Sequence, residues 1–287
     1  MSQPRVAVIT DSISCLTREL AEQYGIEVIP VNFYAEGKIY KDWVDVTPSE
    51  AYELFLKDPE SFKTSSVYPV DCLEAYRKVN QRAQEIVCVT VSAGLSAVYT
   101  VANQAKEQIK AELPQLKIEM VDSKTATAAE GFVALAAARA ATAGKSLAEA
   151  VVAAEEVRKK VTVLATLDTI RHVYRSGRIP KVAAQAASVL NIKPILSISQ
   201  GEIRFEGAVR SRERGIKRML KTLKTKAGQK PLHIAVMHAY APEEGKKLME
   251  RIKSEFNCIE IWLTEFSPVM AYTCGAGVLG FAYYIED

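Results

Sequence analysis

Two serine hydroxyls stand where a short apolar run gives way to a helical pattern, and this arrangement can bind a small anion. The run from Ile86 to Val91 is rich in β-branched residues and has the length of a buried strand. Ser92-Ala93-Gly94-Leu95-Ser96 follows it, and the residues beyond have the apolar spacing of one helical face. Ser96 is predicted to be the N-cap of that helix, whose first amides lack partners within it. Such amides beside hydroxyls favour a carboxylate or phosphate; the simpler interpretation is that Ser96 only caps its own helix.

Other predicted strands also end in small polar residues. Thr10-Asp11-Ser12 and Asp122-Ser123 each follow an apolar, strand-like run, and a further strand is predicted from Ile26 to Phe33. Strand, helix and strand in succession with short connections predict parallel pairing, and ligands bind at the carboxyl ends of such strands. We therefore expect these loops and the loop that contains Thr64 to face one common site.

The helix and strand patterns divide the chain into two predicted domains, residues 1–160 and 161–287. In the second, a helix is predicted to begin at Pro180. The runs Ile192–Ser199 and Ile203–Val209, joined by Gln200-Gly201, are typical of an antiparallel hairpin. A chain of 287 residues is too long for one typical domain and suits two.

The charge of the chain is unevenly distributed. Residues 204–230 contain ten basic and two acidic residues, a local balance of +8, whereas the whole chain carries +3. This stretch is either a solvated helix face or a surface for an acidic partner or an anionic membrane. Nucleic acid is not expected as a partner, because neither a binding motif nor interleaved aromatic residues accompany the charge.

The composition is that of a globular protein with a sizeable core, with 48% hydrophobic and 25% charged residues. Five scattered cysteines without a CxxC spacing predict free thiols in a reducing compartment and no zinc site. A strand pattern begins almost at once, which leaves no room for a signal peptide. We therefore expect a cytoplasmic protein without a metal or another cofactor.

The loops, taken in order, resemble the motifs of the DegV family, the fatty-acid-binding proteins that serve bacterial fatty-acid kinase. The resemblance covers essentially the whole chain. The motifs are Thr10-Asp11-Ser12, Lys63-Thr64-Ser65, Ser92-Ala93-Gly94-Leu95-Ser96, Val121-Asp122-Ser123, Ser176-Gly177-Arg178-Ile179, Ile192-Lys193-Pro194-Ile195-Leu196, Arg210 and Gly275-Ala276-Gly277. Each motif alone is common, but together and in this order they are strong support for the family.

The resemblance implies an α/β fold in two parts. The N-terminal part would be a three-layer α/β/α domain with a parallel sheet, and the C-terminal part a two-layer α/β domain with a mixed sheet. A long-chain fatty acid would be bound with its carboxylate between the domains and its tail in the second one. A kinase subunit would supply ATP and phosphorylate the carboxylate, so the chain would be a lipid-binding protein without chemistry of its own.

The resemblance also implies site residues. Thr64, Ser96 and the backbone amide of Ala97 would bind the carboxylate, and Thr273 is carried over with them. The family's His-Thr-Gly-Pro-Gly becomes Tyr272-Thr273-Cys274-Gly275-Ala276-Gly277 here, so a tyrosine replaces the histidine. We expect the Tyr272 hydroxyl to point at the carboxylate as a neutral donor. By resemblance, two further residues would contribute to docking of the kinase: Arg178 and Arg210.

Two alternatives remain open at this stage. The strand, the Gly94-Leu95-Ser96-Ala97-Val98 turn and the helix resemble the nucleophile elbow of a serine hydrolase or acyl transferase, with Ser96 as nucleophile. That interpretation lacks the second glycine of the motif and a histidine that stands out as base. The other alternative is a membrane- or protein-docking module that uses the basic helix and holds a structural lipid.

Overall fold

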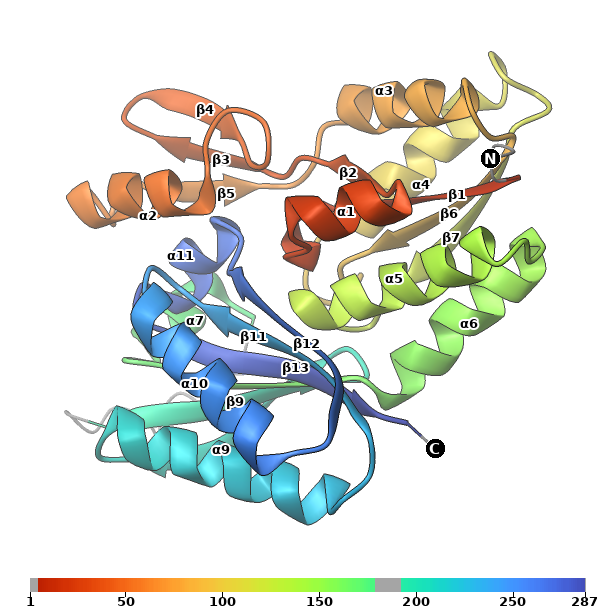
Figure 1. Ribbon diagram of the computed structural model, residues 1–287. Helices are drawn as coiled ribbons and strands as arrows, with labels where there is room; N and C mark the ends of the chain where they lie inside the picture. The colour runs from red at the N-terminus through yellow and green to blue at the C-terminus, as the bar shows by residue number, and fades with distance from the viewer. Residues whose placement is uncertain (1–4, 179–191, 287) are drawn as a thin grey trace.

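A parallel four-stranded sheet forms the centre of the N-terminal half in the computed structural model, which describes residues 5–178 and 192–286 (Figure 1). All its strand pairs are parallel. In order across the sheet the strands are β2 (Glu27–Ile29), β1 (Val6–Asp11), β6 (Glu85–Thr90) and β7 (Lys117–Asp122). Strands β1 and β6 are buried along their whole length, as continuous apolar runs covered on both faces should be.

Helices cover both faces of this sheet (Figure 1). One layer consists of α3 (Pro69–Asn80) and α4 (Val98–Ile109), which pack against each other. The opposite layer consists of α5 (Ala128–Thr142) and α6 (Leu147–Lys160), with α1 (Arg18–Tyr24) beside α5. The expected three-layer α/β/α arrangement with a parallel sheet is confirmed.

The strand predicted from Ile26 to Phe33 is in fact two strands in different sheets. β2 ends at Ile29, and β3 (Asn32–Ala35) belongs to a small antiparallel sheet with β4 (Lys38–Lys41) and β5 (Lys63–Ser65). Pro30 lies between them and has no N–H to continue the ladder. The small sheet, with α2 (Pro48–Lys57) nearby, carries Thr64 on β5.

The C-terminal half is built on a six-stranded mixed sheet. Its order is β10 (Glu202–Val209), β9 (Lys193–Ser199), β8 (Thr162–Thr166), β13 (Leu279–Ile285), β11 (Leu232–His238) and β12 (Cys258–Glu265). Only β11 and β12 pair in parallel. Helices α9 (Arg212–Ala227) and α10 (Pro242–Glu255) cover its outer face (Figure 1). The expected mixed two-layer arrangement and the β9–β10 hairpin are confirmed, whereas the helix expected from Pro180 lies outside the described residues.

Helix α5 is shared between the two halves. It packs on β1 and β6 on one side and contacts β11 and β13 on the other. The ring of Phe132 contacts those of Trp262 and Tyr284, and Arg139 forms an ion pair with Glu260 of β12. A helix between two sheets must be apolar all round, which explains why this alanine-rich segment has no polar face. At Gly131 a Cβ would lie 2.6 Å from the Ser14 carbonyl oxygen, so the close packing requires glycine.

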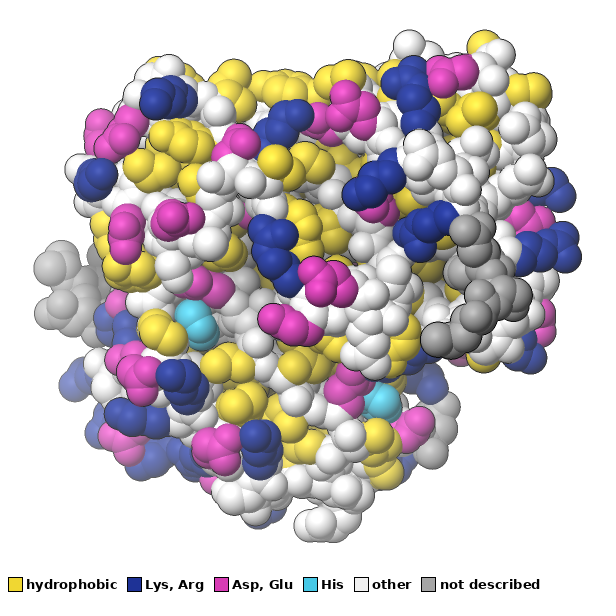
Figure 2. Space-filling view, turned by 45° about the horizontal axis from the view of Figure 1, so that its top comes forward, with side chains coloured by type: hydrophobic (Ala, Val, Ile, Leu, Met, Phe, Trp, Pro, Cys, Tyr) yellow, Lys and Arg dark blue, Asp and Glu magenta, His cyan; other side chains and the backbone are white. Residues whose placement is uncertain are grey.

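The basic stretch at residues 204–230 includes the amphipathic helix α9. Met219, Leu220 and Leu223 are buried against the sheet, and the lysines and arginines of the opposite face are exposed. On the face shown in Figure 2, basic and acidic side chains are interspersed. Within the described residues, none of the helices combines the length and apolar character needed to cross a bilayer.

Candidate functional site

The loop after β6 is held in place through its backbone amides. The Val91 N–H donates to Asp11 Oδ2 at 2.9 Å, and the Ala93 N–H donates to Asp122 Oδ1 at 3.2 Å. Between them, the Ser92 N–H donates to the Thr125 carbonyl oxygen at 2.8 Å. The last residues of β1 and β7, together with Thr125 beyond β7, thus fix the loop after β6, as expected for neighbouring strand ends in a parallel sheet.

The loop leads to Ser96, whose predicted role as an N-cap is wrong. Helix α4 begins at Val98, Ala97 occupies the N-cap position, and no side chain caps the helix. Ser96 lies one residue earlier in a turn, where its own N–H donates to the Ser92 carbonyl oxygen at 3.1 Å. The half-buried Ser96 side chain is therefore not committed to the helix terminus.

Asp11 is a buried carboxyl with a second buried carboxyl beside it. It also accepts from the Ile13 N–H at 3.0 Å, while Thr10 Oγ1 donates to Glu130 Oε1 at 3.2 Å. Burial raises the pKa of Asp11 to about 6. Burial, and then the neighbouring Asp11, raise the pKa of Glu130 well above its usual value. Both side chains are fully buried. Through the hydrogen bonds given above they stabilise the ends of β1 and β6.

The strand-end loops meet segments of both halves around a cavity of about 190 Å³, which we call the outer pocket. The residues that line it are Ile13, Val31, Thr64, Ser65, Ser66, Val91, Leu95, Ser96, Ala97, Ala126, Arg178, Ile198, Ile203, Val269, Met270 and Thr273. Hydroxyl groups are concentrated on β5 and the loop after it and at the start of α4. The structure thus brings together five of the residues singled out from the sequence: Thr64, Ser96, Ala97, Thr273 and Arg178.

Tyr272 is not among the residues that line the outer pocket, contrary to the expectation for its hydroxyl. It lies on a short helix, α11 (Val269–Cys274), that was not predicted. Consecutive helical residues point about 100° apart, so the turn that brings Thr273 to the pocket turns Tyr272 away from it. The guanidinium carbon of Arg175 lies 5.2 Å from the centre of the Tyr272 ring. Arg210 is also outside the pocket and is exposed.

Ser66 is a pocket residue that the sequence reasoning missed. Its Oγ is buried and has no hydrogen-bond partner within the described residues, and its carbonyl oxygen accepts from Asn32 Nδ2 at 3.0 Å. The signal available in the sequence was the unbroken hydroxyl run Thr64-Ser65-Ser66, of which only the first residue was singled out.

A second, smaller cavity of about 40 Å³, the inner pocket, lies against the C-terminal sheet. Its lining is Thr127, Val163, Ala165, Leu167, Val173, Leu196, Ile198, Ile203, Phe266, Met270, Thr273, Cys274 and Val278. Four residues line both pockets: Ile198, Ile203, Met270 and Thr273. A cavity with hydroxyl groups at one end therefore adjoins an apolar cavity, and this is the arrangement that an amphipathic ligand requires.

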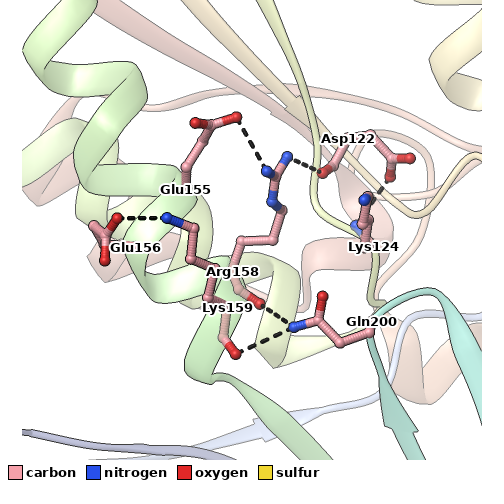
Figure 3. Close-up of polar contacts among 7 residues, drawn as sticks. All are labelled: Asp122, Lys124, Glu155, Glu156, Arg158, Lys159 and Gln200. Carbon is pink, nitrogen blue, oxygen red and sulfur yellow. Dashed lines mark hydrogen bonds and ion pairs between the residues drawn. The ribbon is translucent and has the colours of Figure 1, made fainter.

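The turn of the β9–β10 hairpin ties the second half to the first at the end of α6 (Figure 3). Gln200 Nε2 donates to the Lys159 carbonyl oxygen at 3.1 Å and to that of Arg158 at 3.4 Å, both at the end of α6. The Gly201 N–H donates to the Lys124 carbonyl oxygen. Because Ile198 and Ile203 flank this turn, these contacts hold one wall of both pockets in place.

None of the three histidines, all of which lie in the described residues, lines either pocket. His233 Nδ1 is 2.8 Å from Glu260 Oε2, and burial lowers the pKa of His238 to about 4. His172 lies against the Gly275 turn. A serine nucleophile needs a base within hydrogen-bond reach, and Ser96 has no histidine in its pocket. In the part of the chain that the structure describes, nothing in the geometry supports the hydrolase alternative.

The fold is of the α/β class, with a parallel sheet in its N-terminal part and a mixed sheet in its C-terminal part, and residues of both parts line the two pockets. The family model described as "Uncharacterised protein, DegV family" matches residues 5–286, so the chain belongs to the DegV family. A DegV domain-containing protein of Clostridium perfringens is 32% identical over 284 residues, which cover 98% of this chain and 99% of that protein.

Solved structures agree with this assignment. "Fatty Acid Binding of a DegV family Protein from Thermus thermophilus" matches with a TM-score of 0.86 and 25% identity, covering 98% of this chain and 100% of the other. DegV of Bacillus subtilis, described as a fatty acid binding protein, matches with a TM-score of 0.88 and 26% identity, covering 99% and 100%. Both of these relatives are described as binding fatty acids.

Proposed function

We propose that this protein binds a long-chain fatty acid, with the carboxylate in the outer pocket and the tail extending into the inner pocket. The observation that carries the proposal is the junction of the two pockets at Ile198, Ile203, Met270 and Thr273. The fatty-acid-binding descriptions of the solved relatives support the same ligand class.

The head group would be bound by neutral donors. Thr64, Ser96 and the Ala97 amide are the proposed ligands, and a carboxylate has room for about four hydrogen bonds. Ser66 is the natural additional donor, because its buried Oγ lacks a partner in the described residues. Among the described residues that line the outer pocket, Arg178 is the one that carries a positive charge. Its guanidinium also donates to the Ser176 carbonyl oxygen.

Most of the affinity would come from the acyl chain. Each buried methylene contributes about 0.8 kcal/mol, so a chain of about sixteen carbons needs only orientation from its head group. The inner pocket is smaller than such a tail, so the apolar side chains around it must move apart when the lipid enters. Binding would therefore fix the conformation of the acyl chain and, at the same time, widen the inner pocket.

We further propose that the loaded protein presents the carboxylate to an ATP-dependent kinase subunit in the cytoplasm. Arg178 at the rim and the exposed Arg210 would form part of the docking surface. The basic exposed face of α9 would allow transient contact with an anionic membrane from which lipid is collected. The five cysteines are free, which fits a reducing compartment.

Lipid extraction tests the binding proposal. The protein is purified from a bacterial host, and the extract is analysed by mass spectrometry beside native mass spectra of the intact complex. We expect about one fatty acid per chain, exchangeable for added fatty acid in a saturable manner. An extract without acyl chains, together with no saturable binding of added fatty acid, would overturn the proposal.

A further inference from the structure

Arg175 connects three segments that are far apart in the sequence. It lies on α7 (Arg171–Ser176), and its Nη1 donates to Glu60 Oε1 at 3.0 Å. Its Nη2 donates to the Pro59 carbonyl oxygen at 3.3 Å, so both acceptors lie in the loop between α2 and β5. The same guanidinium lies over the ring of Tyr272 on α11. We call the contact of Arg175 with Pro59, Glu60 and Tyr272 the arginine clamp.

Each segment in the arginine clamp leads to residues that line the outer pocket. Arg178 follows α7, Met270 and Thr273 lie on α11, and Thr64 lies on β5, the strand after the loop. The clamp side chains themselves are all described, and they line neither pocket. The clamp therefore acts on the segments around the pockets and not on a ligand within them.

Other contacts hold α7 against the same neighbours. The ring of His172 on α7 contacts the ring of Phe55 on α2, with 5.7 Å between their centres. At Gly275, just after α11, a Cβ would lie 2.7 Å from His172 Cδ2, so α7 packs closely against this turn. The Arg175 side chain is only 26% exposed. Partial shielding from water strengthens both an ion pair and a cation–π contact.

Passage of a fatty acid requires these segments to separate. The inner pocket, at about 40 Å³, is smaller than a long acyl chain, so its walls must move apart when the chain enters or leaves. Met270 and Thr273 of α11 line both pockets. A displacement of α11 from α7 would separate Tyr272 from Arg175, and a displacement of α7 from the loop before β5 would break the ion pair. The arginine clamp thus stabilises the closed arrangement specifically.

We propose that the arginine clamp sets the rate at which fatty acid enters and leaves the protein. This inference rests on the proposed fatty-acid function and adds control of exchange to it. Because the clamp stabilises the closed state with and without ligand, its loss should speed entry and release alike and leave the equilibrium affinity nearly unchanged. The proposal also gives Tyr272 a role that needs its ring and not its hydroxyl.

Stopped-flow fluorescence measures the release of bound parinaric acid, a fluorescent long-chain fatty acid, into an excess of oleate. Arg175→Ala should release it about tenfold faster than the parent, and Glu60→Gln about threefold faster, as expected for the loss of partly exposed ion-pair and cation–π contacts. The double variant should be little faster than Arg175→Ala, because the two residues share one interaction. Arg77→Ala, which removes an exposed ion pair with Glu112, is the control and should release at the parent's rate.

Two further measurements separate the parts of the clamp. Tyr272→Leu removes the ring face and should speed release, whereas Tyr272→Phe keeps that face and should release at the parent's rate. Raising the salt concentration to about 1 M should speed release from the parent and have less effect on Arg175→Ala, because salt screens exposed ion pairs.

The outcomes separate this proposal from the fatty-acid function. If parinaric acid binds but Arg175→Ala and Glu60→Gln release it at the parent's rate, control by the clamp is wrong and the function stands. A fall in affinity as large as the rise in release rate would also contradict the clamp, because entry would then be unaffected. If neither parinaric acid nor oleate shows saturable binding, the function is overturned, and the clamp with it. Should Arg175→Ala fail to fold, Glu60→Gln and the salt dependence of the parent decide.

Discussion

Asp11 Oδ2 accepts a hydrogen bond from the Val91 N–H at 2.9 Å, and this contact joins the ends of two neighbouring strands behind the outer pocket. The carboxyl is fully buried beside Glu130. A group in this position influences both the shape of the Ser92–Ser96 loop and the dependence of stability on pH.

Asp11→Asn tests how Asp11 affects the dependence of stability on pH. Burial raises the pKa of Asp11 from 3.8 to about 6, so between these values the folded state binds more protons than the unfolded state. The corresponding contribution to stability is full below about pH 4 and is lost as the pH rises through 6. The difference in unfolding free energy between parent and variant should therefore change by about 3 kcal/mol across this window.

Denaturant unfolding at a series of pH values measures that difference. Asp45→Asn, which alters an exposed carboxyl, is the control. Parallel pH profiles for the parent and Asp11→Asn would show that Asp11 does not titrate in this range in the folded protein.

Ser96→Ala separates binding from stability. A hydrogen bond to a charged group is worth about 1.5–3 kcal/mol, so fatty-acid affinity should fall about tenfold to a hundredfold. Because Ser96 caps no helix, the melting temperature should stay close to that of the parent. Thr100→Ala removes an exposed hydroxyl from α4 and serves as the control. An unchanged affinity, measured by titration calorimetry, would remove Ser96 from the head-group site.

Tyr272→Phe tests whether Tyr272, which replaces the family's histidine, contributes to binding of the carboxylate. The structure places this ring beside Arg175 and outside the pocket lining, so affinity should remain within about twofold of the parent. A bond from the hydroxyl to the carboxylate would instead make the loss about tenfold. A tenfold loss, with an unchanged melting temperature, would restore the hydroxyl to the head group and contradict the observed placement.

Arg210→Ala tests presentation to a kinase. The side chain is exposed and outside both pockets, so lipid affinity should be nearly unchanged. Acyl phosphate formation with a matched kinase subunit and ATP should fall several-fold, and more strongly at low salt, because charges at an interface rim act mainly on association. Lys230→Ala, at the far end of the same basic stretch, is the control. Full turnover of the Arg210 variant would exclude this residue from docking.

Much of the fold follows from local pattern. The buried strands β1 and β6 are continuous apolar runs, and the β9–β10 hairpin has its turn at Gln200-Gly201, where both residues have positive φ. The break between β2 and β3 at Pro30 could also have been predicted, because proline has no N–H with which to pair in a sheet. It was missed because the apolar character continues on both sides of the break.

The site was only partly predictable, because it depends on which way neighbouring side chains turn. The sequence predicted that Thr64 and Ser96 would face one site, and both line the outer pocket, although Thr64 lies on β5 of the small antiparallel sheet and not at the end of a parallel strand. It did not show that α4 begins at Val98, which frees Ser96 from capping, nor that α11 turns Tyr272 away.

The affinity of the protein for saturated fatty acids of increasing chain length tests the central proposal most directly. With the carboxylate held in the outer pocket and the tail in the inner one, each added methylene should strengthen binding by about 0.8 kcal/mol, or about fourfold, until the pocket is filled. Titration from about eight to about eighteen carbons should therefore show a steep rise followed by a plateau. Affinities that are independent of chain length, or no saturable binding at any length, would contradict a tail buried in the inner pocket.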